Sequence, residues 1–280
     1  MEDNHLLDAW GHWQRSANHT AQTIIKRREA LEHFCRFTGT TLHGYTTHDV
    51  VKFLSRDGLA PNSRATYYRH LKSFACFAVA AGHRKDNPVL AAPKPRPKAT
   101  LPRPVTPAGL QALLDHAGNP STYMMVLLAA FQGMRVHEIA KVHGRDVDRY
   151  AGSIEISGKG GKHAILPLHA EIGRLMDLHA DKFPGTGYWF PSPTRPGLHL
   201  HTLSVSARLK RAMDAAGIIN RTPHSLRHYF GTTLVRNNVN MRVVQELMRH
   251  SSLQSTQIYV AVDDEEQRAG IDTLLLPQSA

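Results

Sequence analysis

The chain has 280 residues, 41% of them hydrophobic, which is enough to bury a core in each of two domains. Its 34 lysines and arginines outnumber its 23 aspartates and glutamates, and the formal net charge of +11 favours a polyanionic partner. No stretch is apolar for long enough to span a bilayer, the N-terminus is unlike a signal peptide, and two cysteines exclude a disulfide framework, so we expect a cytoplasmic protein without membrane contact.

The first 91 residues are predicted to be helical. One periodic apolar stretch follows Thr20 and ends at Gly39, a second opens at 47–49 and closes at Gly58, and a third begins after 61–63 and stops before Gly82. About four helices with short connections would form a small bundle.

Residues 92–104 are predicted to be a linker, since they hold five prolines, two lysines and two arginines but few apolar side chains. The segment is either a plain spacer or a basic hinge that lets two domains clamp DNA, and its charge favours the hinge.

Residues 105–280 mix helices with strands. Thr106 and Pro107 start a helix, and the run 122–131 is apolar almost throughout, so it must be buried. Two strands at 154–157 and 163–168, joined by a glycine-rich turn, predict a hairpin. Further helices are expected at 169–182, 202–216, 223–237, 240–249 and 263–275. The fold class is therefore mainly α with a small β-sheet (α+β).

Two arginines, two histidines and a tyrosine suggest chemistry on a phosphodiester: Arg135, His224, Arg227, His250 and Tyr259. A tyrosine can hold a phosphate as a covalent ester, and planar guanidinium groups suit the charge of the transition state. His224 and Arg227 share one helical face at their spacing, so both can reach one phosphate. Each residue alone would more often be a core aromatic, a surface histidine or a salt-bridge partner.

The order of these residues resembles the tyrosine recombinase (phage integrase) family, whose signature is Arg, Lys, His-x-x-Arg, His and a nucleophilic Tyr. The resemblance implies an N-terminal, SAM-like core-type DNA-binding bundle at 1–91, the linker 92–104, and a catalytic domain with a C-terminal tail at 105–280. The implied arrangement is Xer-like, because the bundle begins almost at the N-terminus and leaves no room for a separate arm-binding domain. The sequence does not decide among phage integrases, Xer-type resolvases and transposon or integron recombinases.

The family signature implies one role for each matching residue. Tyr259 would be the nucleophile, Lys159 or its neighbour Lys162 the general acid, and Glu138 a buttress for the arginine or histidine side chains. Arg135 and Arg227 would clamp the phosphate, His224 would orient or deprotonate the tyrosine, and His250 would bond a non-bridging oxygen.

Two positions depart from the family pattern. His137 stands where a small hydroxyl residue is usual, and Met248-Arg249 replaces the usual Leu-Gly before the second histidine. Arg249 adds positive charge there, which suggests a further phosphate contact.

Basic residues on two N-terminal helices are predicted phosphate contacts, although charged helix faces are more often simply solvated. They are Lys26, Arg27, Arg28, Arg64, Arg69 and Lys72.

The resemblance implies a site-specific DNA recombinase that needs no cofactor or metal. It would act on double-stranded attachment or core sites as a homo-tetramer, through 3′-phosphotyrosyl intermediates and a Holliday junction, with a possible directionality factor, and it would associate with the nucleoid when bound to DNA. The apolar tail 271–277 would pack either on its own core or on a neighbouring protomer. The alternatives are Xer-type resolution of chromosome dimers, a type IB topoisomerase, and a DNA-binding module with a vestigial site.

Overall fold

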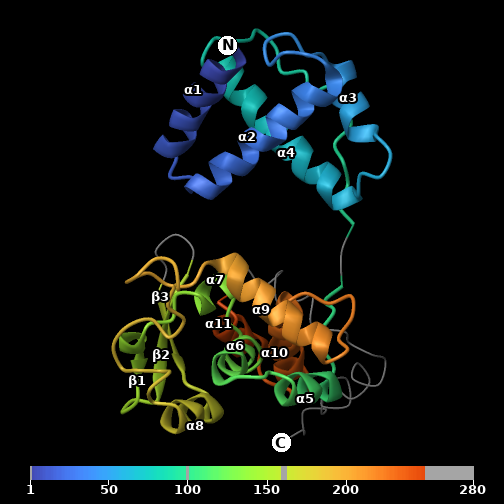
Figure 1. Cartoon of the computed structure of the whole chain (residues 1–280). Coiled ribbons are helices and arrows are strands. Elements are labelled where there is room, and N and C mark those ends of the chain that lie inside the picture. The colour runs from blue at the N-terminus through green and yellow to red at the C-terminus, as the bar shows by residue number, and fades with distance from the viewer. Residues whose placement is uncertain (1, 99–100, 159–162, 250–280) are drawn as a thin grey trace, which may run out of the picture. The chain divides into compact units, whose positions relative to one another are not determined.

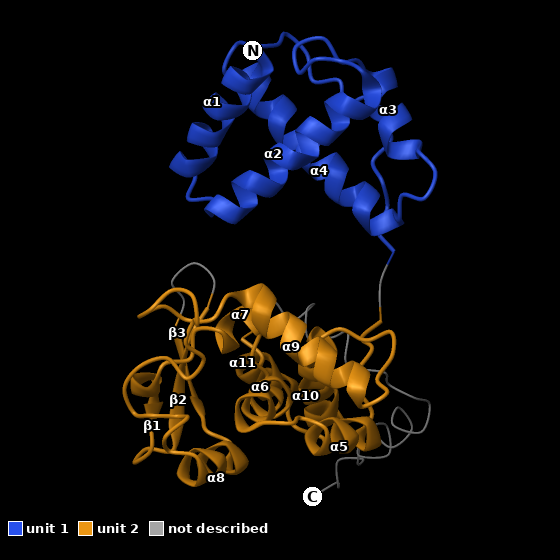
Figure 2. Cartoon of the chain, in the orientation of Figure 1, with its two compact units in different colours: residues 1–100 blue, residues 101–280 orange. Residues whose placement is uncertain are grey.

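The computed structural model describes residues 2–98, 101–158 and 163–249. The chain divides into two compact units, residues 1–100 and 101–280 (Figure 2). The boundary falls inside the proline-rich segment 92–104: Ala92 is buried in the core of unit 1, and Val105 is buried in the core of unit 2. Within the described ranges, no helix is long and apolar enough to cross a membrane.

Unit 1 is a bundle of α1 (Glu2–Ser16), α2 (Ala21–Thr38), α3 (Thr47–Ser55) and α4 (Pro61–Ala80) (Figure 1). Local sequence sets the ends of α2, because the Thr20 side chain accepts a hydrogen bond from the backbone N–H of Thr23 and Gly39 closes the helix with φ of 73°. Thr46 and Asp49 form a capping box at the start of α3.

Aromatic side chains fill the core of unit 1. Trp10 of α1 meets Phe74 of α4 edge to face at 5.3 Å between ring centroids, and Phe34 of α2 meets Phe53 of α3 at 5.2 Å. Such pairs add to the stabilisation that comes from burying apolar area. The bundle therefore presents α2 and α4 on a fixed scaffold.

Unit 2 holds eleven elements within the described part of the chain. They are α5 (Pro107–Asp115), α6 (Pro120–Ala130), α7 (Val136–Ile139), the 3-10 helix η1 (Gly144–Asp146), β1 (Val147–Asp148), β2 (Ser153–Ser157), β3 (His163–Pro167), α8 (Ala170–Leu178), α9 (Thr202–Ala215), α10 (His224–Arg236) and α11 (Met241–Leu247). The sequence did not predict the short elements α7, η1 and β1. The helix expected at 263–275 lies outside the described residues.

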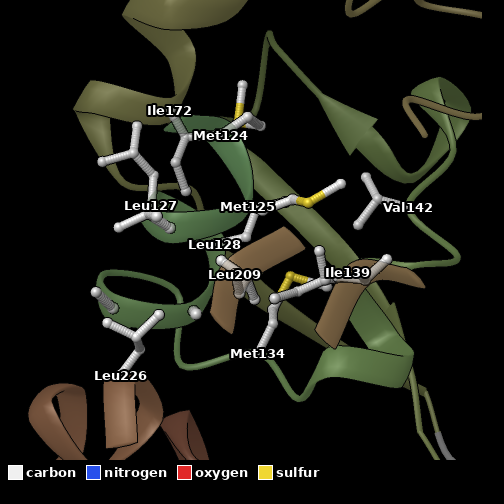
Figure 3. Packing of buried hydrophobic residues seen from close by; sticks show 14 of the residues in the cluster. Met124, Met125, Leu127, Leu128, Met134, Ile139, Val142, Ile172, Leu209 and Leu226 are labelled. Atoms are coloured by element: carbon white, nitrogen blue, oxygen red, sulfur yellow. The ribbon is translucent and has the colours of Figure 1, made fainter. Parts of the chain in front are cut away.

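Helix α6 is the centre of the unit 2 core, as its unbroken apolar sequence predicts. It packs against α5, α7, α8, α9 and α10. Figure 3 shows four of its side chains meeting residues of the surrounding helices and connecting segments. The labelled residues are Met124, Met125, Leu127 and Leu128 of α6, with Met134, Ile139, Val142, Ile172, Leu209 and Leu226 around them. This packing places the segment after α6 next to α10.

The sheet is antiparallel, in the order β1-β2-β3, and the predicted hairpin is its β2–β3 pair. Ile154 lies opposite Leu166 with both side chains buried, and their neighbours along each strand are more accessible. This alternation is what a sheet with one face on the core requires. The prediction of a mainly α fold with a small sheet is confirmed.

Candidate active site

The segment between α6 and α7 turns sharply at Gly133. Its φ of +60° lies in the left-handed region, and a Cβ there would stand 2.5 Å from Cδ1 of Phe230 on α10. Only glycine accepts both conditions without strain. The turn directs the chain into Arg135, which is the N-cap residue of α7.

Arg135 and Glu138 form a two-point contact across the first turn of α7. The Arg135 side chain donates from Nη1 to Oε1 of Glu138 at 2.9 Å, and the Arg135 backbone N–H donates to Oε2 at 2.7 Å. Glu138 has a fully buried side chain, whereas 34% of the Arg135 side chain is exposed. The guanidinium is thus held on one side and remains accessible to an anion on the other.

Burial alone would raise the pKa of Glu138, but its arginine partners outweigh that effect. Arg249, the backbone N–H of Arg135 and the Arg135 guanidinium together hold the pKa below its ordinary value. Glu138 is therefore ionised at neutral pH.

Arg227, one turn into α10, is buried with only 1% of the residue exposed. Its guanidinium donates from Nη1 to the carbonyl of Gly133 and from Nη2 to the carbonyl of Met248. These bonds tie α10 to the α6–α7 turn and to the end of α11. Buried charge requires such partners, and they leave the guanidinium a single orientation.

His224 is the first residue of α10, and its imidazole lies near the charges of Arg227 and Arg135. Burial of the ring, Arg227 and Arg135 all lower its pKa, so the ring is neutral at neutral pH even though part of the residue stays accessible. Its ring centroid lies 4.5 Å from that of His228, whose pKa is lowered to about 4 by burial, His224 and Arg227. A neutral His224 has the lone pair that a proton acceptor needs.

Arg249 points into the protein, in contrast to the added phosphate contact that its charge suggests. Its Nη2 donates to Oε2 of Glu138 at 2.8 Å and to the carbonyl of Gly133 at 3.0 Å, and its side chain is 9% exposed. The structure therefore brings Arg135, Glu138, His224, Arg227 and Arg249 together around the α6–α7 turn.

Four of the predicted catalytic residues lie outside the described residues: Lys159, Lys162, His250 and Tyr259. The tail 271–277 lies outside them as well. Ser157 and His163, the last pair of the β2–β3 hairpin, flank the stretch that carries the two lysines. Among the residues that the structure describes, no group of three or more His, Cys, Asp or Glu side chains is arranged to hold a metal ion.

Unit 1 has an open groove, with a volume of about 990 Å³, between α2 and α4. Of the six predicted DNA contacts, only Lys26 lines it. The other side chains include Arg36, His33, His70 and Asn62, which sequence reasoning missed. On α2, His33 and Arg36 follow Lys26 by seven and ten residues, which places all three on one helical face. A search of the sequence by helical face would have found them.

The other predicted contacts in unit 1 differ in accessibility. Arg27 donates to Oε1 of Gln14 at 2.9 Å, and Arg28 pairs with Asp8 and Glu32, so both are engaged within the bundle. Arg64 is half-buried, whereas Arg69 and Lys72 are exposed on α4. Only part of the basic cluster thus forms an accessible surface.

Comparison with known proteins identifies the family. Residues 104–266 match the model of the Phage integrase family. Tyrosine recombinase XerC of Shewanella amazonensis is 30% identical over 219 residues, which cover 75% of this chain and 73% of that protein.

Solved structures agree with this family. An integrase from mycobacterium phage Brujita has 36% sequence identity and a TM-score of 0.51, over 95% of this chain and 91% of that one. A lambda integrase dimer bound to a COC′ core site has 20% identity and a TM-score of 0.74, over 90% of this chain and 96% of that one, and shows the same fold. The chain belongs to the phage integrase family, the tyrosine recombinases, and is a DNA strand-transferring enzyme of site-specific recombination.

Proposed function

We propose that this recombinase integrates and excises a mobile element or phage genome, with Tyr259 as its nucleophile and double-stranded attachment or core sites as its substrate. The observation that carries the proposal is the meeting of Arg135, Arg227 and the neutral His224 at the α6–α7 turn. Two guanidinium groups beside a proton acceptor are what attack on a phosphodiester requires.

The proposed cleavage step conserves bond energy. The Tyr259 oxygen gives up its proton with help from His224 and attacks phosphorus, which forms a 3′-phosphotyrosyl ester and breaks the bond to the 5′ oxygen. Lys159, or Lys162, gives that oxygen a proton, so that a 5′-hydroxyl leaves. Arg135, Arg227 and His250 stabilise the charge on the non-bridging oxygens.

Strand exchange reverses the same step. A 5′-hydroxyl from the partner strand attacks the phosphotyrosyl ester, the tyrosine leaves, and a Holliday junction results once one pair of strands has exchanged. We propose that four protomers carry out the two rounds of strand exchange. The tail 271–277 would pack on its own core or on a neighbouring protomer. A directionality factor would decide between integration and excision.

We propose that residues 1–91 form the core-type DNA-binding domain, 92–104 a basic linker and 105–280 the catalytic domain. The groove between α2 and α4 supports a DNA-contacting role for the first, since Lys26 and Arg36 line it. The structural relative bound to a core site supports a double-stranded DNA partner. Acting on DNA would place the protein in the cytoplasm, at the nucleoid.

Xer-type resolution of chromosome dimers is the second candidate, because a XerC protein is among the relatives. The two functions differ in their DNA. Fragments from a mobile-element boundary should be recombined under the first, and chromosomal terminus fragments under the second.

The test of the proposal is covalent capture of DNA. Wild type and Tyr259→Phe are incubated with nicked duplexes made from DNA that flanks the coding sequence in its source genome, and adducts are resolved on a denaturing gel. An adduct with wild type alone is expected. Tight binding without an adduct would favour a binding module, and relaxation of plasmids without any cognate site would favour a topoisomerase.

The general acid has its own test. Lys159→Ala should recover cleavage on a duplex with a 5′-bridging phosphorothiolate, since that leaving group needs no proton. Rescue of Lys162→Ala in its place would assign the role to Lys162.

A further inference from the structure

Arg249 occupies a backbone conformation that an arginine rarely adopts. Its φ is +52°, in the left-handed region, which costs a residue with a Cβ roughly 1–2 kcal/mol. Its side chain is also largely buried, with 9% of it exposed. Such a placement persists only where the surrounding contacts stabilise it.

Those contacts converge on the support of Arg135. Glu138 uses Oε1 for the Arg135 guanidinium, and its Oε2 receives both the Arg135 backbone N–H and Nη2 of Arg249. Arg249 also shares the carbonyl of Gly133 with Arg227. One side chain thus touches the carboxylate that holds one guanidinium and the carbonyl that holds the other.

Charge explains why the second arginine matters. A single carboxylate buried with Arg135 alone would be poorly compensated, since burial is the largest influence on Glu138 and favours its neutral form. A neutral Glu138 would lose much of its hold on the guanidinium of Arg135. Arg249 supplies the second positive charge at the oxygen that the Arg135 side chain leaves open.

We propose that Arg249 is a positioning residue of the strand-transfer reaction: it fixes the Glu138 carboxylate, and through it the orientation of the Arg135 guanidinium toward the scissile phosphate. The proposal rests on the function proposed above. It assigns Arg249 no contact with DNA.

The experiment measures adduct formation in a single turnover, at saturating concentrations of the nicked duplex that wild type captures. Arg249→Met keeps an unbranched stem but removes the guanidinium with its charge and donors, and should slow adduct formation about 10- to 100-fold with little change in Kd. Arg249→Gly relieves the left-handed backbone and should fold stably, yet be equally slow. Slow cleavage by a stable protein separates positioning from folding.

Two readouts distinguish positioning from a merely structural role. Without Arg249 the pKa of Glu138 rises, so the acidic limb of the rate profile should move to higher pH in Arg249→Met. In a double-mutant cycle, Arg249→Met should add little to the slowing caused by Glu138→Gln, because both remove the same support.

The control is an exposed arginine–glutamate pair of similar length. Arg174 and Glu171 on α8 are 2.9 Å apart between Nε and Oε2, against 2.8 Å for Arg249 and Glu138, but their side chains are 61% and 47% exposed. Arg174→Met should leave rate, pH profile and Kd unchanged.

Three results would overturn the inference. The first is a wild-type rate in Arg249→Met, and the second is slowing by Arg249→Met that adds fully to the slowing by Glu138→Gln. The third is an unchanged rate in Arg249→Met with a weaker Kd and a shallower salt dependence, which would mean that Arg249 contacts a phosphate. Failure of the proposed function looks different, since wild type itself would then form no adduct, and that result overturns both.

Discussion

The arginines around the α6–α7 turn of unit 2 and the basic residues on the surface of α2 and α4 in unit 1 are held in opposite ways. In unit 2, Arg227 and Arg249 are buried and donate to backbone carbonyls from distant parts of the chain. In unit 1, Lys26, Arg69 and Lys72 are exposed at the surface of α2 and α4. The same kind of charge is fixed at the α6–α7 turn and solvated on the surface of α2 and α4.

Under the proposed function, the difference follows from what each unit does with a phosphate. A guanidinium that stabilises a transition state acts best when its orientation is set before the reaction, which needs burial and fixed partners. A cation that contacts the DNA backbone gains mainly from the release of counterions, which needs only accessibility. Buried cations should therefore control rate, and exposed cations should control affinity and its dependence on salt.

The largest effect is expected on the buried side of this contrast. Arg227→Ala should slow adduct formation about 100- to 1,000-fold at saturating DNA, because it removes a preorganised donor. Single-turnover kinetics measure the rate of adduct formation, and a gel shift measures the Kd for DNA. Arg227→Lys keeps the charge without the planar fork and should recover little of the rate. A weaker Kd at an unchanged rate in Arg227→Ala would erase the contrast.

Gly133, whose carbonyl accepts hydrogen bonds from both buried arginines, should tolerate substitution poorly. Gly133→Ala meets both the left-handed φ and the ring of Phe230, and should lower the free energy of unfolding by about 2–4 kcal/mol. Urea unfolding followed by circular dichroism measures it. Gly152→Ala is the control, since Gly152 has the same φ of 60° but open space around its Cβ, and should cost only about 1 kcal/mol. Equal losses in the two variants would show that Phe230 imposes no constraint.

Burial around the site should also make unit 2 sensitive to acid. The pKa of His228 is lowered to about 4 in the folded protein, against about 6.5 when unfolded. Between these values the unfolded chain binds the proton more readily, so stability falls as pH drops from about 6.5 to 4. The full shift corresponds to about 3 kcal/mol, and solvent screening of the half-buried ring reduces the expected loss to about 1–2 kcal/mol. His228→Gln should flatten that part of the curve of unfolding free energy against pH. A variant as acid-sensitive as wild type would remove His228 as the cause.

The smallest effect is expected on the exposed side. Lys26→Gln should weaken DNA binding about threefold and reduce the slope of log K against log salt by about one, with the cleavage rate at saturation unchanged. Binding titrations at several salt concentrations measure both the affinity and its salt slope. Lys52→Gln, an exposed lysine on α3 outside the α2–α4 groove, is the control. A slower cleavage rate with Lys26→Gln would show that unit 1 also acts in the chemical step.

Local signals were enough for most of the longer elements, although no predicted range covered α1. Thr20 and Gly39 mark the two ends of α2 because a side-chain cap and a left-handed glycine act within one turn of the chain. The four-residue α7 and the two-residue β1 carry no comparable signal. They form because Glu138 caps α7 from a buried position and because β1 pairs with β2.

The amino-acid sequence by itself determined the residue types and their order, which identify the chemistry, and the apolar run that makes α6 the core of unit 2. Only the tertiary structure decided how the cations are used. The carbonyl of Gly133 receives Arg227 from 94 residues away and Arg249 from 116 residues away. The direction of a charged side chain depends on which partners the fold brings beside it, and no local pattern encodes contacts over such separations.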